Sequence, residues 1–66
     1  MPVITITMGE GQATSQQKKE LIESFTENAT AITGLPAKVF TILINELGDD
    51  NIGVAGKTLA QMKSDL

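Results

Sequence analysis

The chain has 66 residues, a net charge of −3 and 41% hydrophobic residues. It contains neither cysteine nor histidine, which excludes disulfides, thiolate metal sites and imidazole catalysis. Its five basic residues are all lysines and are dispersed, so we expect no nucleic-acid partner. The first residues lack a basic region followed by a long apolar one, and no apolar run approaches the roughly 20 residues that span a bilayer. We therefore expect a cytoplasmic protein without a membrane partner.

The size of the chain predicts a single domain over residues 1–66 that works as an oligomer. A domain of about 60 residues buries only about 60% of the surface of its unfolded chain, so it is marginally stable alone. Small domains of this kind use disulfides, a metal or partner subunits for additional stability. With cysteine and histidine absent, partner subunits are the remaining means.

The first half of the chain predicts a strand and a helix. Apolar and polar β-branched residues alternate over 3–8, as in a strand with two different faces. Thr14 and Gln17 have the spacing of a capping box, which marks a helix start. Gly34 fits the left-handed end of that helix, and Pro36 prevents its continuation. One apolar stripe along the helix is formed by Leu21, Ile22, Phe25, Ala29 and Ile32.

The second half predicts another strand followed by smaller elements. Residues 39–45 are almost continuously apolar, as in parallel strands that are covered on both faces. A strand, a helix and a second strand form a parallel β-α-β unit. One helix covers only one face of two strands, which is a second argument for partner subunits. Residues 52–57 predict a small hairpin or an extended arm, and residues 58–66 one or two helical turns.

Pro2 is the candidate reactive residue because of its position behind Met1. Removal of Met1 would leave a secondary amine at the chain start. An ordinary α-amino group has a pKa of about 7.7–8.0, and an apolar pocket lowers the pKa by disfavouring the charged form. Such an amine could act as a base that removes a proton next to a carbonyl. It could also attack a carbonyl to form an iminium. The alternative is that Pro2 only begins a strand, where its missing N–H costs nothing.

Two other patterns have ordinary interpretations. Residues 53–58 look superficially like a phosphate loop, but the first glycine of that motif would fall at position 51, which is Asn51. A tight turn near another subunit is the simpler interpretation. Asp49 and Asp50 could suggest a cation site, but adjacent carboxylates point in different directions, so we interpret them as a solvated turn. We expect no metal and no cofactor.

The order of these features resembles the 4-oxalocrotonate tautomerase family, also called the 2-hydroxymuconate tautomerase family, over essentially the full chain. The resemblance rests on Pro2 behind Met1, on the strand motif Thr-Ile-Leu-Ile-Asn-Glu at 41–46 and on Asn-Ile-Gly-Val-Ala-Gly at 51–56. It implies an α+β fold: a β-α-β subunit with parallel strands and a short C-terminal hairpin, assembled as a trimer of dimers. It also implies a cofactor-independent isomerase that moves a proton through the proline nitrogen.

The resemblance also shows where this chain departs from the family. The family's two site arginines fall at Gln12 (or Ala13, if the loop insertion is placed differently) and at Thr41. The family's site phenylalanine falls at Ile52, which could keep the apolar role. Neither Gln12 nor Thr41 supplies the planar, bidentate and permanent charge of arginine. Lys38, just before the second strand, could replace that charge, as could Lys57; for both, an ordinary surface lysine is the alternative.

Two functions therefore remain open, beside a third that has no specific support: another proline-amine reaction of the same superfamily, such as hydration of an unsaturated acid or dehalogenation. The first is a tautomerase or isomerase that uses Pro2 for 1,3-keto-enol or allylic proton transfer in a small 2-hydroxy-dienoate or enol acid, with Gln12, Lys38, Thr41 and Ile52 as substrate-binding residues. The second is a tautomerase-fold homologue with weak or no activity that acts in binding or assembly. The loss of both arginines motivates the second.

Overall fold

A computed structural model describes residues 1–65 of the chain. In chain order its helices and strands are β1 (Val3–Gly9), α1 (Ser15–Thr33), β2 (Thr41–Leu47), β3 (Gly53–Val54), β4 (Lys57–Thr58) and α2 (Leu59–Ser64). Two single-turn 3₁₀ helices, η1 (Ala37–Val39) and η2 (Asp49–Asn51), precede and follow β2.

Strands β1 and β2 form a parallel pair whose register runs from Val3 opposite Thr41 to Gly9 opposite Leu47. The predicted β-α-β unit is thus confirmed, but the second strand begins later than predicted. Val39 belongs to η1, where its N–H donates to the carbonyl of Pro36 over 3.1 Å. An apolar run marks burial but not hydrogen bonding, so it could not distinguish a tight turn from the first residues of a strand.

Helix α1 begins and ends at the predicted signals. The Thr14 hydroxyl accepts from the Gln17 N–H over 3.1 Å, and the Gln17 side chain accepts from the Thr14 N–H over 2.9 Å. At the other end Gly34 has φ 76°, and its N–H donates to the carbonyl of Thr30 over 2.9 Å. Glycine is favourable at this left-handed position because it lacks the Cβ that would clash.

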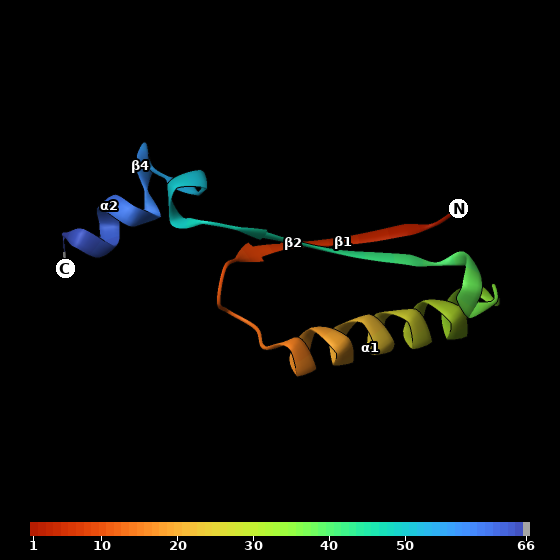
Figure 1. Ribbon diagram of the computed structural model, residues 1–66. Coiled ribbons are helices and arrows are strands. Elements are labelled where there is room, and N and C mark those ends of the chain that lie inside the picture. Colours follow the sequence, from red (N-terminus) through yellow and green to blue (C-terminus); the bar gives the residue numbers. More distant parts are fainter. Residues whose placement is uncertain (66) are drawn as a thin grey trace.

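Helix α1 covers one face of the two-stranded sheet (Figure 1). Over residues 3–8 of β1 the even positions are half-buried and the odd ones are exposed, as expected when successive side chains alternate between faces. On the uncovered face, Val3 is 50% and Leu43 is 48% exposed. Only part of the apolar stripe of α1 is buried against the sheet. Leu21 is half-buried, whereas Ile22 is 40% and Ile32 is 85% exposed.

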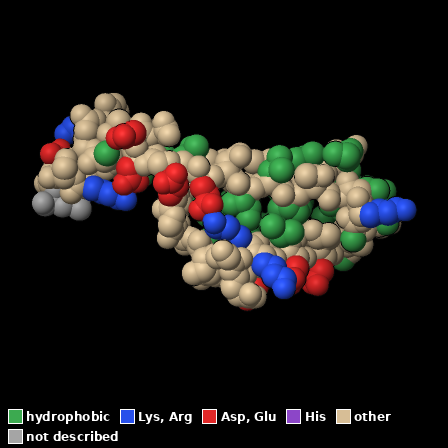
Figure 2. Space-filling model, viewed as in Figure 1, with side chains coloured by type: hydrophobic (Ala, Val, Ile, Leu, Met, Phe, Trp, Pro, Cys, Tyr) green, Lys and Arg blue, Asp and Glu red, His purple; other side chains and the backbone are tan. Residues whose placement is uncertain are grey.

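Residues 1–65 of the single chain enclose no core. No hydrophobic side chain within residues 1–65 is fully buried. Figure 2 shows apolar side chains at the surface, between the two strands and α1. The radius of gyration is 15.6 Å and the extents are 48 × 24 × 14 Å, whereas a compact domain of this length has a radius of gyration of about 11 Å. Residues 1–65 therefore leave much of their apolar surface open to contacts from outside the chain.

The C-terminal part forms an arm at the far end of β2, away from α1 (Figure 1). Strands β3 and β4 pair antiparallel, which confirms the predicted hairpin. The two residues between them, Ala55 and Gly56, have φ 53° and 84°, and positive φ at both central positions is the requirement of a type I′ turn. Helix α2 begins with a second capping box, between Thr58 and Gln61. Neither α1 nor α2 is long and apolar enough to cross a membrane.

Candidate functional site

Pro2 immediately precedes β1 and is tied to the start of β2. Its carbonyl oxygen accepts a hydrogen bond from the N–H of Thr41 over 3.1 Å. Its own nitrogen is in the peptide bond with Met1, which is 93% exposed. A tertiary amide is not basic, so Pro2 could act as an amine only after removal of Met1.

Pro2 lines a hollow of about 550 Å³, a volume within the usual range of small-molecule sites. The hollow is lined by Met1, Pro2, Leu35, Lys38 and Val39. Lys38 is the only charged residue in this set, and the others are apolar. The structure thus brings Lys38, predicted from the sequence as a possible substitute for arginine, to the same hollow as Pro2.

The parallel register explains this hollow. Both strands of a parallel pair start at the same end, so the residues that precede β2 lie beside those that precede β1. Leu35 and Val39 were not predicted as site residues. The signal that could have identified them is their position just before a strand that pairs in parallel with the strand behind Pro2.

Thr41 is the first residue of β2 and lies opposite Val3. Its side chain is half-buried and does not line the hollow beside Pro2. What Thr41 contributes at Pro2 in this subunit is its backbone N–H, and that contribution does not depend on the side chain.

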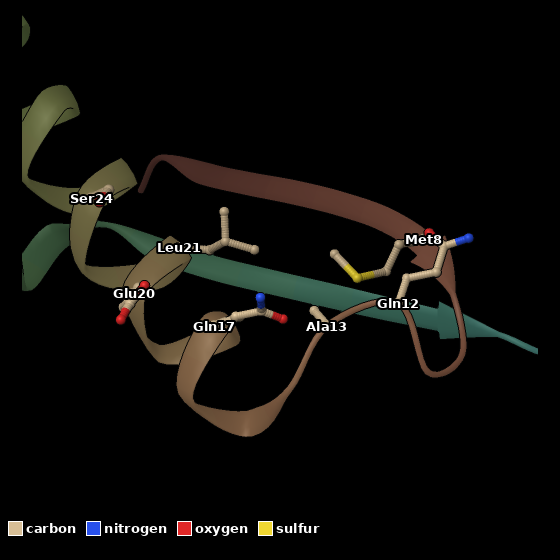
Figure 3. A pocket seen from close by; sticks show the side chains of 7 residues that line it. All are labelled: Met8, Gln12, Ala13, Gln17, Glu20, Leu21 and Ser24. Carbon is tan, nitrogen blue, oxygen red and sulfur yellow. The ribbon is translucent and has the colours of Figure 1, made fainter.

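Gln12 lies at the opposite end of the sheet, just beyond β1. Seven residues at about 3.3 Å each separate the two ends of the strand by about 20 Å. Gln12 lines a second hollow of about 500 Å³, between β1 and the first half of α1, with Met8, Ala13, Gln17, Glu20, Leu21 and Ser24. Figure 3 shows Gln12 at the strand end, with Met8 and Leu21 between strand and helix. The Gln12 amide nitrogen lies 3.0 Å from the place where a side chain on Gly9 would begin.

Ile52 lies beyond η2, also at the end of the sheet remote from Pro2, and its side chain is half-buried. Its carbonyl accepts from the N–H of Leu59 over 2.9 Å, which joins it to the start of α2. One subunit therefore unites Pro2 with Lys38 but not with Gln12 or Ile52. A site with all of these residues would require more than one subunit.

Among residues 1–65 the acidic side chains lie apart from one another or in ion pairs with lysines. Within the described part of the chain, no group of three or more His, Cys, Asp or Glu side chains could hold an ion. Asp49 accepts a hydrogen bond from Lys63 over 2.9 Å, so its carboxylate serves as a contact between η2 and α2. The glycine-rich segment 53–58 folds as the β3–β4 hairpin, and its last residue, Thr58, is the N-cap of α2.

The fold is a small α+β unit in which a parallel β-α-β motif carries a C-terminal hairpin arm and a proline stands directly before the first strand. The sequence matches the family model described as "Tautomerase enzyme" over residues 2–62. The chain belongs to this tautomerase family.

Individual members of the family are similar over nearly the whole chain. The 2-hydroxymuconate tautomerase of Bacillus subtilis is 38% identical over 63 residues, which are 96% of this chain and 100% of that protein. A 4-oxalocrotonate tautomerase isozyme of Methylibium petroleiphilum superposes with a TM-score of 0.86 at 32% identity, over 98% of this chain and 100% of that one. A heterohexameric 4-oxalocrotonate tautomerase of Chloroflexus aurantiacus superposes with a TM-score of 0.80 at 29% identity, over 94% and 98%.

Proposed function

We propose that this protein is a cofactor-independent tautomerase whose base is the amine of Pro2, released by removal of Met1. The substrate class is a small 2-hydroxy-dienoate or another enol acid. The observation that carries the proposal is the position of Pro2, at the start of β1 in an apolar hollow that also holds Lys38. The similarity to tautomerases along the whole chain supports the same chemistry.

The proposed reaction moves one proton. The Pro2 nitrogen takes the proton of the enol hydroxyl, and the oxygen electron pair forms the carbonyl. The electrons of the carbon–carbon double bond then take this proton from the nitrogen and form a C–H bond at the carbon remote from the oxygen. In an allylic transfer, the new C–H bond forms at the end of the conjugated chain instead. The apolar walls favour the neutral amine over the charged one, and a base with a pKa near neutrality is suited to both halves of this transfer.

The assembly is part of the proposal. We infer that residues 1–66 act as one domain in a homo-oligomer, most simply a hexamer built as a trimer of dimers. The absence of enclosed core within residues 1–65 and the exposed Val3 and Leu43 on the uncovered sheet face support subunit contacts. In such an assembly Gln12 and Ile52 of neighbouring subunits could join Pro2 and Lys38, with Ile52 as an apolar wall, and the Thr41 side chain could face a neighbour's site.

A second candidate function is binding or assembly without tautomerase activity. The observation that favours it is the absence of arginine from the chain, because loss of a charge-assisted hydrogen bond to a substrate carboxylate costs about 1.5–3 kcal/mol. This candidate predicts a folded oligomer that turns over no enol acid.

Ketonisation of 2-hydroxymuconate and of phenylenolpyruvate tests the two candidates. Three preparations are compared, each with its mass determined: the protein starting at Pro2, a form that retains Met1, and Pro2→Ala. The tautomerase proposal predicts turnover by the first preparation and a loss of at least about 100-fold in the other two, the scale of one general acid–base group. Equal turnover by Pro2→Ala contradicts the role of Pro2, and no turnover of either enol by any preparation favours the second candidate.

A further inference from the structure

Among the described residues of one subunit, Lys38 carries the only charged side chain that lines the hollow beside Pro2. Three of the five lysines form ion pairs within the described chain, namely Lys18–Glu46, Lys57–Asp65 at 3.9 Å and Lys63–Asp49 at 2.9 Å. Neither Lys19 nor Lys38 has a carboxylate within 4.0 Å among residues 1–65. Lys19 lies on the exposed face of α1, remote from the hollow. Lys38 is thus the cation at the Pro2 hollow that no acidic side chain of this part of the chain neutralises.

The rest of the hollow, as one subunit forms it, offers no second cationic side chain for a negative charge. Leu35 and Val39 lie on either side of Lys38 in the sequence and line the hollow with it. A carboxylate placed against them would lose its hydration without gaining a partner, which is unfavourable. An apolar group placed there would be released from water, which is favourable. One end of a ligand is therefore suited to be an anion and the other end to be apolar.

We infer that the site selects singly charged acids with an apolar body and discriminates against dicarboxylates. The ligand carboxylate binds the Lys38 ammonium, and its apolar part covers Leu35 and Val39. This inference rests on the proposed function, because it specifies the substrate class of the same site. Lys38 is its specificity-determining residue: an ammonium is a compact point charge with three donors and holds one carboxylate without the planar fork of arginine.

Two planar conjugated acids test the selectivity. In trans-cinnamate a phenyl ring occupies the end at which trans,trans-muconate carries its second carboxylate. Dissociation constants of both are measured by calorimetry on the intact oligomer that starts at Pro2. We expect cinnamate to bind at least about 10-fold more tightly, the lower end of the effect of one charged hydrogen bond. Equal or tighter binding of muconate, or no binding of either acid, overturns the inference.

Variants of two lysines identify the anchor. Lys38→Gln should weaken cinnamate binding by about 10- to 100-fold, and Lys38→Arg should retain most of the binding because the positive charge remains. Lys19→Gln, the matched loss of an unpaired lysine, should leave binding unchanged. An unchanged affinity in Lys38→Gln overturns the role of Lys38, as does an equal loss in Lys19→Gln. Should Lys38→Gln fail to assemble, the cinnamate–muconate comparison in the unaltered protein still decides the selectivity.

Failure of this inference is distinguishable from failure of the proposed function. Binding of the two acids requires no turnover, whereas the role of Pro2 is tested by the rate of ketonisation. A protein that loses turnover in Pro2→Ala and yet prefers muconate is a tautomerase for dicarboxylates. A protein that prefers cinnamate and turns over no enol binds single acids without catalysing the proposed reaction.

Discussion

The N–H of Thr41 donates a hydrogen bond of 3.1 Å to the carbonyl oxygen of Pro2. This bond extends the β1–β2 ladder by one residue beyond the first register pair, Val3 and Thr41. It holds the start of the chain against the start of β2, so the candidate amine is placed by sheet pairing rather than by a flexible tail. Because a backbone group makes the contact, the placement of Pro2 does not depend on the side chain of Thr41.

The sheet face that α1 leaves uncovered predicts that folding depends on protein concentration. Leu43 lies in the middle of β2 on the face that α1 leaves open, 48% exposed. We expect Leu43→Lys to dissociate the oligomer and lower its melting temperature, since burial of an unpaired charge at a subunit contact is costly. Gln16→Lys, which adds the same charge at an exposed position on α1, should have little effect.

Sedimentation and thermal melting over a hundredfold range of protein concentration check this prediction. An oligomer that unfolds as it dissociates melts at a higher temperature when it is more concentrated. A monomer with a melting temperature independent of concentration would contradict it.

The capping box of α1 predicts that replacing Thr14 by alanine lowers stability more than replacing Thr26 by alanine. Thr14→Ala should lower the free energy of unfolding by about 1 kcal/mol per subunit, because the N–H groups at the helix start lose their acceptor. Thr14→Ser should retain most of that stability. Thr26 provides a matched control: its hydroxyl donates to the carbonyl of Ile22 within the helix, over 2.8 Å. Thr26→Ala should cost little, since alanine is the better helix former. Chemical denaturation at fixed protein concentration measures the three values, and an equal loss in Thr14→Ala and Thr26→Ala would refute the role of the cap.

The hairpin turn predicts a stabilising substitution. Ala55 has φ 53°, a conformation that costs an ordinary L-residue roughly 1–2 kcal/mol and that asparagine tolerates better. Asn-Gly is also the preferred pair in type I′ turns. We expect Ala55→Asn to raise the free energy of unfolding by about 0.5–1 kcal/mol and Ala55→Val to lower it, because a β-branched residue is strained at positive φ.

Ala31→Asn, at an exposed position of α1, is the control for the side chain itself. It should lower the stability, since asparagine is the poorer helix former. If Ala55→Asn lowered the free energy of unfolding as Ala31→Asn does, the prediction of strain at this turn would be contradicted.

The ion pair between Lys18 and Glu46 predicts a measurable coupling between α1 and β2. The two side chains are 28% and 32% exposed, so the pair is screened less than an open surface pair. A double-mutant cycle with Lys18→Met and Glu46→Gln should give a coupling energy of about 0.5–1 kcal/mol that decreases with salt. Lys19 has no acidic partner among residues 1–65. Lys19→Met in place of Lys18→Met therefore serves as the control cycle, which should give no coupling energy. A coupling energy of zero at low salt would show that the contact does not contribute to stability.

Much of the fold was predictable because it is encoded locally. The capping box of Thr14 and Gln17, the helix end at Gly34 and the hairpin at 53–58 each depend on residues a few positions apart. The strands and the helix follow from periodicity, and their order implies the parallel pairing. The limits of β2 were not predictable in the same way, since the apolar residue Val39 satisfies its backbone in a turn at Pro36.

Sequence alone thus determined the β-α-β order, and it predicted subunit contacts and a role for Pro2, because each follows from neighbouring residues or from composition. Only the tertiary structure decided which other residues Pro2 meets. Lys38 lies 36 positions away in the sequence but lines the same hollow, because parallel strands start at the same end. Gln12 is nearer to Pro2 in the sequence and yet lies at the opposite end of the sheet, because an extended strand separates them.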